Sequence, residues 1–292
     1  MKKLSAIFFA MVITMSAPLA FADDRVGKLE FASTLEETLG HFWALEKNLD
    51  DKNAKLALVH ASHPIAELYG TMQPYLTDNP DFDKKLRDNL LELQNKATIN
   101  VSREQAQDAI EESKAMVQQA REIVVGDLSN DNDFKMQLIQ GLLQTSIIEY
   151  HEAVSDGIIK EMAEFQDGSS FVWESQQIYN TLEGIDPKDS ERIDRLYAEL
   201  WTAFENNVEP KDQANLADAL TNEFEELSGI SIERAVIEED EFPAPLKQIK
   251  EGIAPKDVQC NAGMHLMYKL NGNVACIKES SVVKLLERGW TE

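Results

Sequence analysis

The chain has 292 residues and a strongly acidic composition, in which 52 Asp and Glu residues stand against 28 Lys and Arg residues. The resulting net charge of −24 at pH 7 opposes binding to nucleic acid and to anionic lipid, because both would repel the protein. It favours a cation or a basic partner, or it serves only to keep the protein soluble. At 43% hydrophobic residues, the chain can bury one large core or two moderate ones.

Residues 1–22 have the features of a secretory signal peptide. Lys2 and Lys3 give a basic start, residues 4–19 are mostly apolar, and Ala20-Phe21-Ala22 provides a small-residue cleavage site. An uncleaved N-terminal anchor is the alternative, because the apolar run is nearly long enough to span a bilayer. No second apolar run of this length follows. We therefore predict an extracytoplasmic protein, secreted or held at the cell surface, which does not insert directly into the membrane after cleavage.

Four helices are predicted after a short polar lead at residues 23–33. Thr34 and Glu37 have the spacing of a capping box, and Ser102 is a further N-cap candidate. Apolar residues recur at the helical period between these positions. The predicted helices span residues 34–50, 53–76, 82–97 and 102–125, and together they make a first four-helix unit at 34–125.

A second set of four helices is predicted after a polar break that ends at residue 133. Pro187 and Pro210 stand where a first helical turn tolerates proline. The period-two alternation typical of strands is almost absent from residues 34–228. The predicted helices span residues 134–156, 158–183, 187–207 and 211–228, which gives a second four-helix unit at 134–228.

The two sets of helices have the pattern of an internal repeat. A shift of 107 positions superposes Glu67 on Glu174 and the helix start Ser102 on Glu209. Helical sequences also align in this way by chance, so two unrelated bundles are the alternative. In both cases the predicted fold class is mainly all-α, with two consecutive four-helix bundle-like units.

The last part of the chain has a different composition. Residues 229–254 are predicted to form an acidic, proline-containing linker, and residues 255–292 a compact module. Asn271-Gly272-Asn273 between two apolar runs predicts a β-hairpin. Cys260 and Cys276 are the only cysteines, and in an oxidising compartment they are predicted to pair. A two-cysteine metal or redox site is the alternative, although no C-x-x-C spacing is present.

Residues 58–72 carry the clearest candidate metal ligands. If this stretch is helical, His60, His63 and Glu67 share the face opposite the apolar stripe. Two imidazoles and a carboxylate suit zinc, copper or iron, but a further ligand would have to come from another helix. A solvated helix face is the alternative. Pro64 removes a backbone donor, which predicts a kink near His63.

His41 and His151 are the candidates for additional ligands. His41 lies at the edge of the apolar face of the first predicted helix. His151 lies on an apolar face of the helix at residues 134–156, where a histidine is more often a core residue than a ligand. Position 155 is serine, so His151-Glu152 does not belong to the H-E-x-x-H motif of zinc proteases.

No motif of a catalytic mechanism is present. The sequence lacks a glycine-rich phosphate loop and a G-x-S-x-G elbow, and no cysteine is free to act as a nucleophile if Cys260 and Cys276 pair. A hydrolase is therefore the least favoured class, and we predict a protein that is not an enzyme. Met264, His265 and Met267 offer donors for copper, but a hairpin that packs its apolar face on the helical body explains these residues better.

Two segments of the helical region resemble a known family. HASHPIAELY at residues 60–69 and EYHEAVSDGIIKEMAEFQDGSSFV at residues 149–172 look like the extracytoplasmic helical domain of archaeal oxidase-dependent iron permeases. Similar helical domains accompany secreted blue-copper domains. The resemblance implies metal handling, with iron or copper as the ion. The membrane helices and R-E-G-L-E motifs of the permease are missing, and so is a blue-copper domain, so the resemblance does not imply transport itself.

The C-terminal region carries a second resemblance. The segments at residues 245–260 and 284–290 are similar to a C-terminal module on exported proteins of ammonia-oxidising archaea. This resemblance implies an archaeal, extracytoplasmic address and no particular activity. The glycosylation sequon at Asn100 would also suit a surface loop of a secreted protein.

These observations predict a secreted, non-enzymatic helical binding protein that handles an iron or copper ion. His60, His63 and Glu67 are the first ligand candidates, with His41 and His151 as additions. The alternative is a cell-surface or envelope protein–protein interaction module without a metal site, whose helical faces dock onto an envelope or membrane protein. A nucleic-acid partner is not expected in either case.

Overall fold

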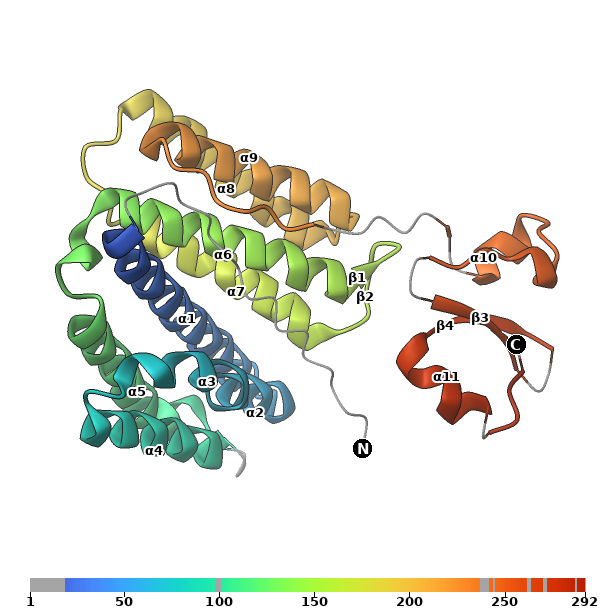
Figure 1. Ribbon diagram of the computed structural model, residues 1–292, viewed down its shortest axis with the longest axis horizontal. Coiled ribbons are helices and arrows are strands. Elements are labelled where there is room, and N and C mark those ends of the chain that lie inside the picture. The colour runs from blue at the N-terminus through green and yellow to red at the C-terminus, as the bar shows by residue number, and fades with distance from the viewer. Residues whose placement is uncertain are drawn as a thin grey trace. The chain divides into compact units, whose positions relative to one another are not determined.

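The computed structural model describes residues 19–97, 101–236, 242–243, 245–261, 264–269, 272–286 and 288–291. Two compact units are present, divided between Ala235 and Val236. The first unit is helical, and the second is small and contains a β-hairpin (Figure 1). Most of the predicted signal peptide and the sequon at Asn100 lie outside the described residues. Within the described ranges, no helix combines the length and the apolar character needed to cross a bilayer.

The first set of helices is interrupted by irregular turns after its second helix. Ser102 and Gln105 form a capping box at the start of the last helix of this set, which confirms Ser102 as an N-cap. The elements are α1 (Leu19–Asp50), α2 (Ala54–His63), the π-helical turn η1 (Pro64–Leu68), α3 (Tyr69–Met72), the 3-10 turn η2 (Gln73–Leu76), α4 (Pro80–Ala97) and α5 (Arg103–Val124).

The predicted polar lead at residues 23–33 is wrong, because α1 already begins at Leu19. Leu29 and Phe31 are fully buried, so this stretch belongs to the core. Thr34 lies inside the helix, where its hydroxyl donates to the carbonyl oxygen of Glu30 and caps nothing. The charged residues between positions 23 and 30 conceal the apolar period in the sequence.

The predicted kink near His63 is confirmed as a π-helical turn. Pro64 begins this turn, and the N–H of Tyr69 donates to the carbonyl oxygen of Pro64 across five residues. Proline has no N–H to continue the bonding pattern of α2, so the helix widens at this point. The turn ends α2 at His63 and shifts the helical register of the residues that follow, Glu67 among them.

The second set of helices contains a short hairpin that the sequence analysis did not predict. Asp156 and Gly157 have φ angles of 54° and 64°, a turn conformation that Asp-Gly favours, and they join two strands of two residues each. The expected helix at residues 158–183 therefore starts later. The elements are η3 (Gly126–Asn130), α6 (Asn132–Ala153), β1 (Val154–Ser155), β2 (Ile158–Ile159), α7 (Met162–Tyr179), α8 (Pro187–Asn206) and α9 (Pro210–Ser228).

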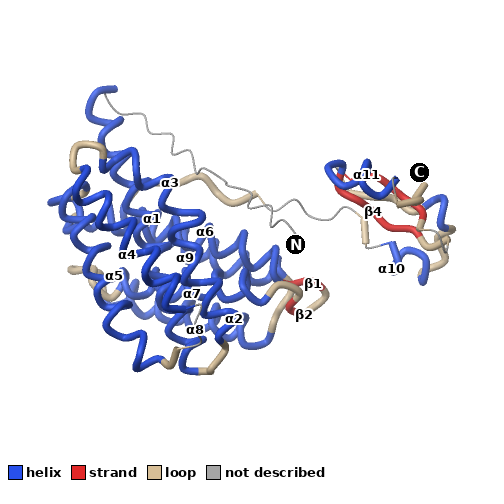
Figure 2. Tube along the Cα trace, turned by 90° about the horizontal axis from the view of Figure 1, so that it is seen from below, coloured by secondary structure: helices blue, strands red, loops and turns tan. Residues whose placement is uncertain are grey.

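Helix α1 lies between the two sets. It packs on α2 and α5 of its own set and on α6 and α7 of the second set, while α4 pairs with α5 and α8 pairs with α9 (Figures 1 and 2). Both sets contribute large, fully buried aromatic side chains, namely Phe31, Phe42, Phe134, Tyr150, Tyr197 and Phe224. The predicted all-α class is confirmed, and the two sets share one compact unit.

The C-terminal unit, Val236–Glu292, contains the predicted disulfide-closed hairpin together with residues of the predicted linker. Cys260 and Cys276 are bonded, with their Cα atoms 5.5 Å apart. The strands pair antiparallel, with Met264 opposite Lys278. Met267 is fully buried, whereas His265, which lies on the same face of β3 two residues earlier, is exposed. The elements are α10 (Pro245–Lys250), η4 (Pro255–Asp257), β3 (Met264–Tyr268), β4 (Val274–Lys278) and α11 (Glu279–Leu286), and α10 contacts β4.

Candidate metal centre

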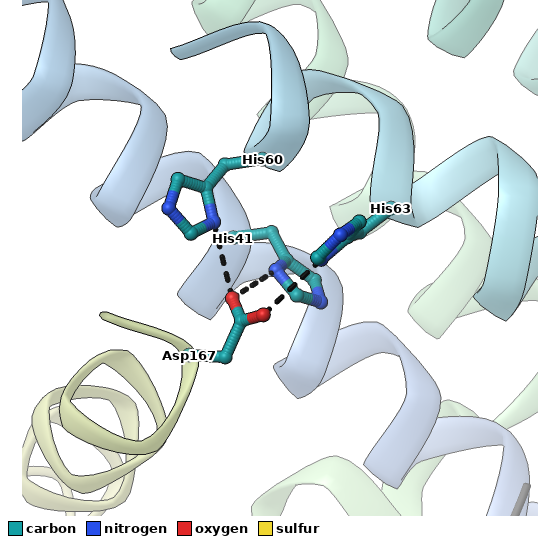
Figure 3. Close-up of side chains that lie close together, drawn as sticks. All are labelled: His41, His60, His63 and Asp167. Carbon is teal, nitrogen blue, oxygen red and sulfur yellow. Dashed lines mark hydrogen bonds and ion pairs between the residues drawn. The ribbon is translucent and has the colours of Figure 1, made fainter. Parts of the chain in front are cut away.

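Four buried side chains from three helices converge in the core of the helical unit. His41 comes from α1, His60 and His63 come from the last turn of α2, and Asp167 comes from the second turn of α7. Their exposed fractions are 4%, 0%, 6% and 2%. Figure 3 shows the three imidazoles arranged around the carboxylate of Asp167.

Each imidazole presents its Nδ1 atom to the carboxylate of Asp167. Nδ1 of His41 lies 2.8 Å from Oδ1, Nδ1 of His60 lies 3.1 Å from the same oxygen, and Nδ1 of His63 lies 3.2 Å from Oδ2. One ligand atom from each of the four residues lies within 4.8 Å of all the others. Four ligands of a tetrahedral ion, each about 2.1 Å from it, are about 3.4 Å apart. Small side-chain movements would therefore convert this group into a coordination sphere.

Two of the imidazole nitrogens are buried without a hydrogen-bond partner. Nδ1 of His41 and Nδ1 of His63 lie close to Asp167, but neither makes a hydrogen bond with it. A buried polar atom without any partner costs about 1–3 kcal/mol, and the close approach of Asp167 offsets part of this cost when the imidazoles are protonated. A transition-metal ion at the centre would bind both nitrogen lone pairs and remove this cost.

The tautomer of His60 is set by two amide side chains behind it. Asn48 donates an N–H to the side-chain oxygen of Gln166 at 2.9 Å, which fixes this oxygen on the side of His60. Nε2 of His60 lies 2.7 Å from the same oxygen and must donate to it. In neutral His60 the free lone pair is then on Nδ1, which faces the centre. Metal-binding histidines are commonly oriented by such a hydrogen bond from the other ring nitrogen.

The electrostatics of the group favour a negative charge on its carboxylate. Burial alone would raise the pKa of Asp167, but the charge of His41 and the close approach of all three imidazoles hold this pKa well below its usual range. Burial lowers the pKa of His41. Burial would also lower the pKa of His63, but Asp167, Glu67 and Glu164 raise it on balance. The group therefore offers an ionised carboxylate and three imidazoles, and the raised pKa of His63 means that this ring must release a proton when a metal ion binds.

The structure brings three of the predicted ligands together and leaves two outside. His41, His60 and His63 belong to the converging group. Glu67 lies at the rim, with its side chain 33% exposed and its Oε1 atom 3.9 Å from Nε2 of His63. His151 is half-buried in the last turn of α6 and is not part of the group.

The solvated helix face considered for His60 and His63 is wrong, because both residues are buried. Helix α2 packs on α1 and also contacts α7. The face opposite Ala61 is therefore covered by protein as well, and Ala61 itself is buried. A helix enclosed on two sides has no solvent side for these histidines to occupy.

Asp167 is the member of the group that the sequence analysis did not single out. It follows His60 by 107 residues, and nothing beside it in α7 marks a site. The shift that superposes Glu67 on Glu174 also superposes His60 on Asp167. The repeat thus contained a signal for this residue, although only the structure shows that the two equivalent positions touch.

Comparison with known proteins identifies one related domain. Residues 125–231 match the family described as iron permease-associated 4-helix bundle domain. No curated protein and no solved structure gives a significant match. The resemblance of the helical region to the iron permease domain is thus confirmed for α6 to α9. Asp167 lies within the matched residues, whereas the three histidines precede them.

Proposed function

We propose that this protein binds a transition-metal ion, with iron as its natural cargo, through His41, His60, His63 and Asp167. The observation that carries the proposal is the convergence of three Nδ1 atoms on one buried carboxylate, two of them without a hydrogen-bond partner. The match of α6 to α9 to an iron permease-associated domain supports iron as the ion. Copper is the other candidate, and the experiment below separates the two.

The donor set suits divalent ions of intermediate hardness. Imidazole nitrogen binds iron, copper and zinc, and a carboxylate oxygen adds affinity for the harder ions among them. Both cysteines are in the disulfide, so no thiolate can join the set to favour a soft ion such as Cu(I). Carboxylate and imidazole together support Fe²⁺ more strongly than Cu(I).

The residues of the chain have distinct parts in this function. Asp167 supplies the negative charge that balances a cation in the core. Gln166 and Asn48 hold His60 with its lone pair toward the centre. Burial excludes water from all four ligand side chains. These parts describe reversible binding, in which no covalent bond of the protein forms or breaks, so the proposed function is not enzymatic.

The test is metal binding by the full chain, measured by elemental analysis and titration calorimetry with Fe²⁺ under anaerobic conditions, Cu²⁺ and Zn²⁺. The site variant is His60→Ala/His63→Ala. The matched control is His151→Ala/His265→Ala, which removes the same number of imidazoles from outside the group. We expect stoichiometric binding by the wild type and the control, and none at this site in the site variant.

The results also decide between the ions. Iron as cargo requires that Fe²⁺ binds stoichiometrically and is the ion that the protein contains when isolated from its own cells. Isolation with copper would replace iron by copper in the proposal. Equal binding by the wild type and His60→Ala/His63→Ala would overturn the proposed site, and no binding of any of the three ions would overturn metal handling altogether.

We also propose an extracytoplasmic location and a membrane permease as the partner that receives the ion. The description of the matched domain, the acidic composition and the predicted signal peptide support this part. Ile158 on β2 and Met162 at the start of α7 are 55% and 43% exposed, which makes the short hairpin end of the helical unit a suitable contact. Apolar side chains exposed together favour protein contact over solvent.

Cross-linking in the native membrane tests this partner. Ile158→Glu/Met162→Glu should reduce cross-links to an iron permease, whereas Ile123→Glu, at a side chain 37% exposed on α5, should leave them unchanged. Cross-links that are equal in all three proteins would remove this surface from the proposal. Fractionation and N-terminal sequencing would establish the location and the cleavage.

A further inference from the structure

Glu67 is the predicted ligand that lies at the rim of the candidate metal centre. It belongs to η1, the π-helical turn that directly follows His63. Its Oε1 atom is 3.9 Å from Nε2 of His63, and its side chain is 33% exposed. Turns of this kind within helices often occur at functional sites. Glu67 therefore lies between solvent and one imidazole of the centre.

His63 has one ring nitrogen on each side of this boundary. Nδ1 faces Oδ2 of Asp167 at 3.2 Å, whereas Nε2 faces Glu67. At 6% exposure, His63 is also the most exposed member of the group of four. A cation held by Glu67 would thus be separated from the buried centre by a single imidazole ring.

The other two imidazoles are closed off by neighbouring side chains. Nε2 of His60 is hydrogen-bonded to Gln166 at 2.7 Å. The ring of His41 lies edge-on to Phe171, with 5.5 Å between the ring centroids, and Phe171 is 3% exposed. An ion that entered beside either ring would have to displace a bonded amide or a buried aromatic side chain. Entry at the rim requires neither, because the carboxylate there already contacts solvent.

The charges near the rim favour a cation. Glu67 and the half-buried Glu164 of α7 are carboxylates outside the group of four whose charges act on His63. They belong to a chain with a net charge of −24. Negative charge along such an approach raises the association rate of a cation by about 10- to 1,000-fold. A partly exposed carboxylate can also bind a hydrated ion without the cost of burying its own charge.

We propose that Glu67 is the entry residue of the metal site, which binds the incoming, still hydrated Fe²⁺ at the rim and passes it beside His63 to the group of four. This inference rests on the proposed metal function. An oxygen ligand suits a hydrated ion of this kind. Because Nδ1 of His63 faces the centre and Nε2 faces Glu67, the carboxylate lies on the far side of the ring from the bound ion. Glu67 should therefore set the rates of uptake and release and contribute little to the final affinity.

The test measures these rates with the full chain under anaerobic conditions. Protein and Fe²⁺ are mixed, and a chelator that forms a coloured Fe²⁺ complex captures the free ion after increasing times. The same chelator added to loaded protein gives the release rate. The site variants are Glu67→Gln, which removes the charge, and Glu67→Asp, which keeps it. The matched control is Glu122→Gln, which removes one exposed carboxylate from α5.

The expected result is a change in rates without a change in affinity. Uptake and release should both be at least about threefold slower in Glu67→Gln, with an affinity within about twofold of the wild type. Glu67→Asp and the control should keep the wild-type rates. The difference between Glu67→Gln and the wild type should shrink in 1 M salt, where charges are screened beyond about 3 Å.

The outcomes separate this inference from the proposed function. Wild-type rates in Glu67→Gln would overturn the entry role and leave the metal site standing. Rates in Glu67→Asp as slow as those in Glu67→Gln would overturn it as well, because the charge would not be what acts. An affinity lower by about tenfold or more in Glu67→Gln would make Glu67 a ligand or an orienting residue of the final site instead. No uptake by the wild type would overturn both proposals.

Discussion

Asp167 presents its two carboxylate oxygens to three imidazoles. His41 and His60 approach Oδ1, and His63 approaches Oδ2. Asp167 is also the one member of the group of four that comes from the second set of helices. The charge of the centre and its connection between the two sets therefore depend on a single side chain.

Replacement of this carboxylate should abolish most of the metal affinity. Asp167→Asn keeps the shape of the side chain but removes its charge and one acceptor oxygen. Loss of a residue that only orients a ligand costs about 10- to 100-fold in affinity, so loss of a ligand should cost at least about 100-fold. Titration calorimetry measures the change, with Asp108→Asn on the exposed side of α5 as the control. Affinity within a few-fold of the wild type would show that Asp167 is not a ligand.

The raised pKa of Glu37 determines how this residue makes the stability of the metal-free protein depend on pH. Burial, with a further contribution from Asp167, raises the pKa of Glu37 to about 7 from 4.5. The folded protein therefore keeps this proton up to about pH 7, whereas the unfolded chain loses it near pH 4.5. Between these values the folded state binds more protons, so Glu37 makes the free energy of unfolding fall as the pH rises.

Glu37→Gln removes this titration. Between pH 4.5 and pH 8, the free energy of unfolding of the wild type should fall by about 1–3 kcal/mol more than that of the variant. This range allows for the partial exposure of the side chain. Urea unfolding with a chelator present, at both pH values, measures the difference. Glu112→Gln on the exposed side of α5 should keep the wild-type pH dependence. A wild-type slope in Glu37→Gln would contradict the raised pKa.

At the scale of the elements, helix starts marked by a cap or a proline were predictable. Ser102, Pro187 and Pro210 each stand at or beside the start of the expected helix. The beginning of α1 was not predictable, because charged residues interrupt its apolar period. The hairpin β1–β2 was missed for another reason. Strands of two residues are too short to show alternation, although Asp156-Gly157 carries the turn signal.

The cap at Ser102 makes a measurable prediction for α5. The Ser102 hydroxyl accepts from the N–H of Gln105, and the Gln105 side chain accepts from the N–H of Ser102. Ser102→Ala should lower the free energy of unfolding by about 1 kcal/mol, and Ser102→Gly by only a few tenths. Urea unfolding compares the two variants with the wild type. Equal losses in alanine and glycine variants would mean that the cap does not limit the stability of α5.

At the scale of the whole molecule, the two sets of helices repeat each other in their spacing. Helices α8 and α9 begin 107 residues after α4 and α5, and Asp167 follows His60 by the same interval. His60 and Asp167, the equivalent positions of the two sets under this shift, are in hydrogen-bond contact. Helical periodicity was therefore sufficient for the fold class, and it gave the three histidines only as candidates together with Glu67 and His151. Their convergence on Asp167 depends on how the halves pack, which no local pattern contains.

The position of the centre between the two sets predicts that metal binding stabilises their packing. An ion held by His41, His60 and His63 on one side and Asp167 on the other binds the folded unit and not the separated helices. At a free metal concentration of 100 times the Kd, this adds about 2.7 kcal/mol to the free energy of unfolding. For a chain of this size, the Tm should rise by about 5–11 °C.

Differential scanning calorimetry with and without a chelator measures this shift, and the controls decide where the ion acts. His151→Ala/His265→Ala should show the full rise, because neither histidine belongs to the group. Asp167→Asn should show almost none at the same free metal concentration, since the contribution of the second set is lost. A rise of equal size in Asp167→Asn would mean that the ion stabilises the first set of helices alone. The buried contact between His60 and Asp167 would then be a feature of packing between the two halves and not the site of the ion.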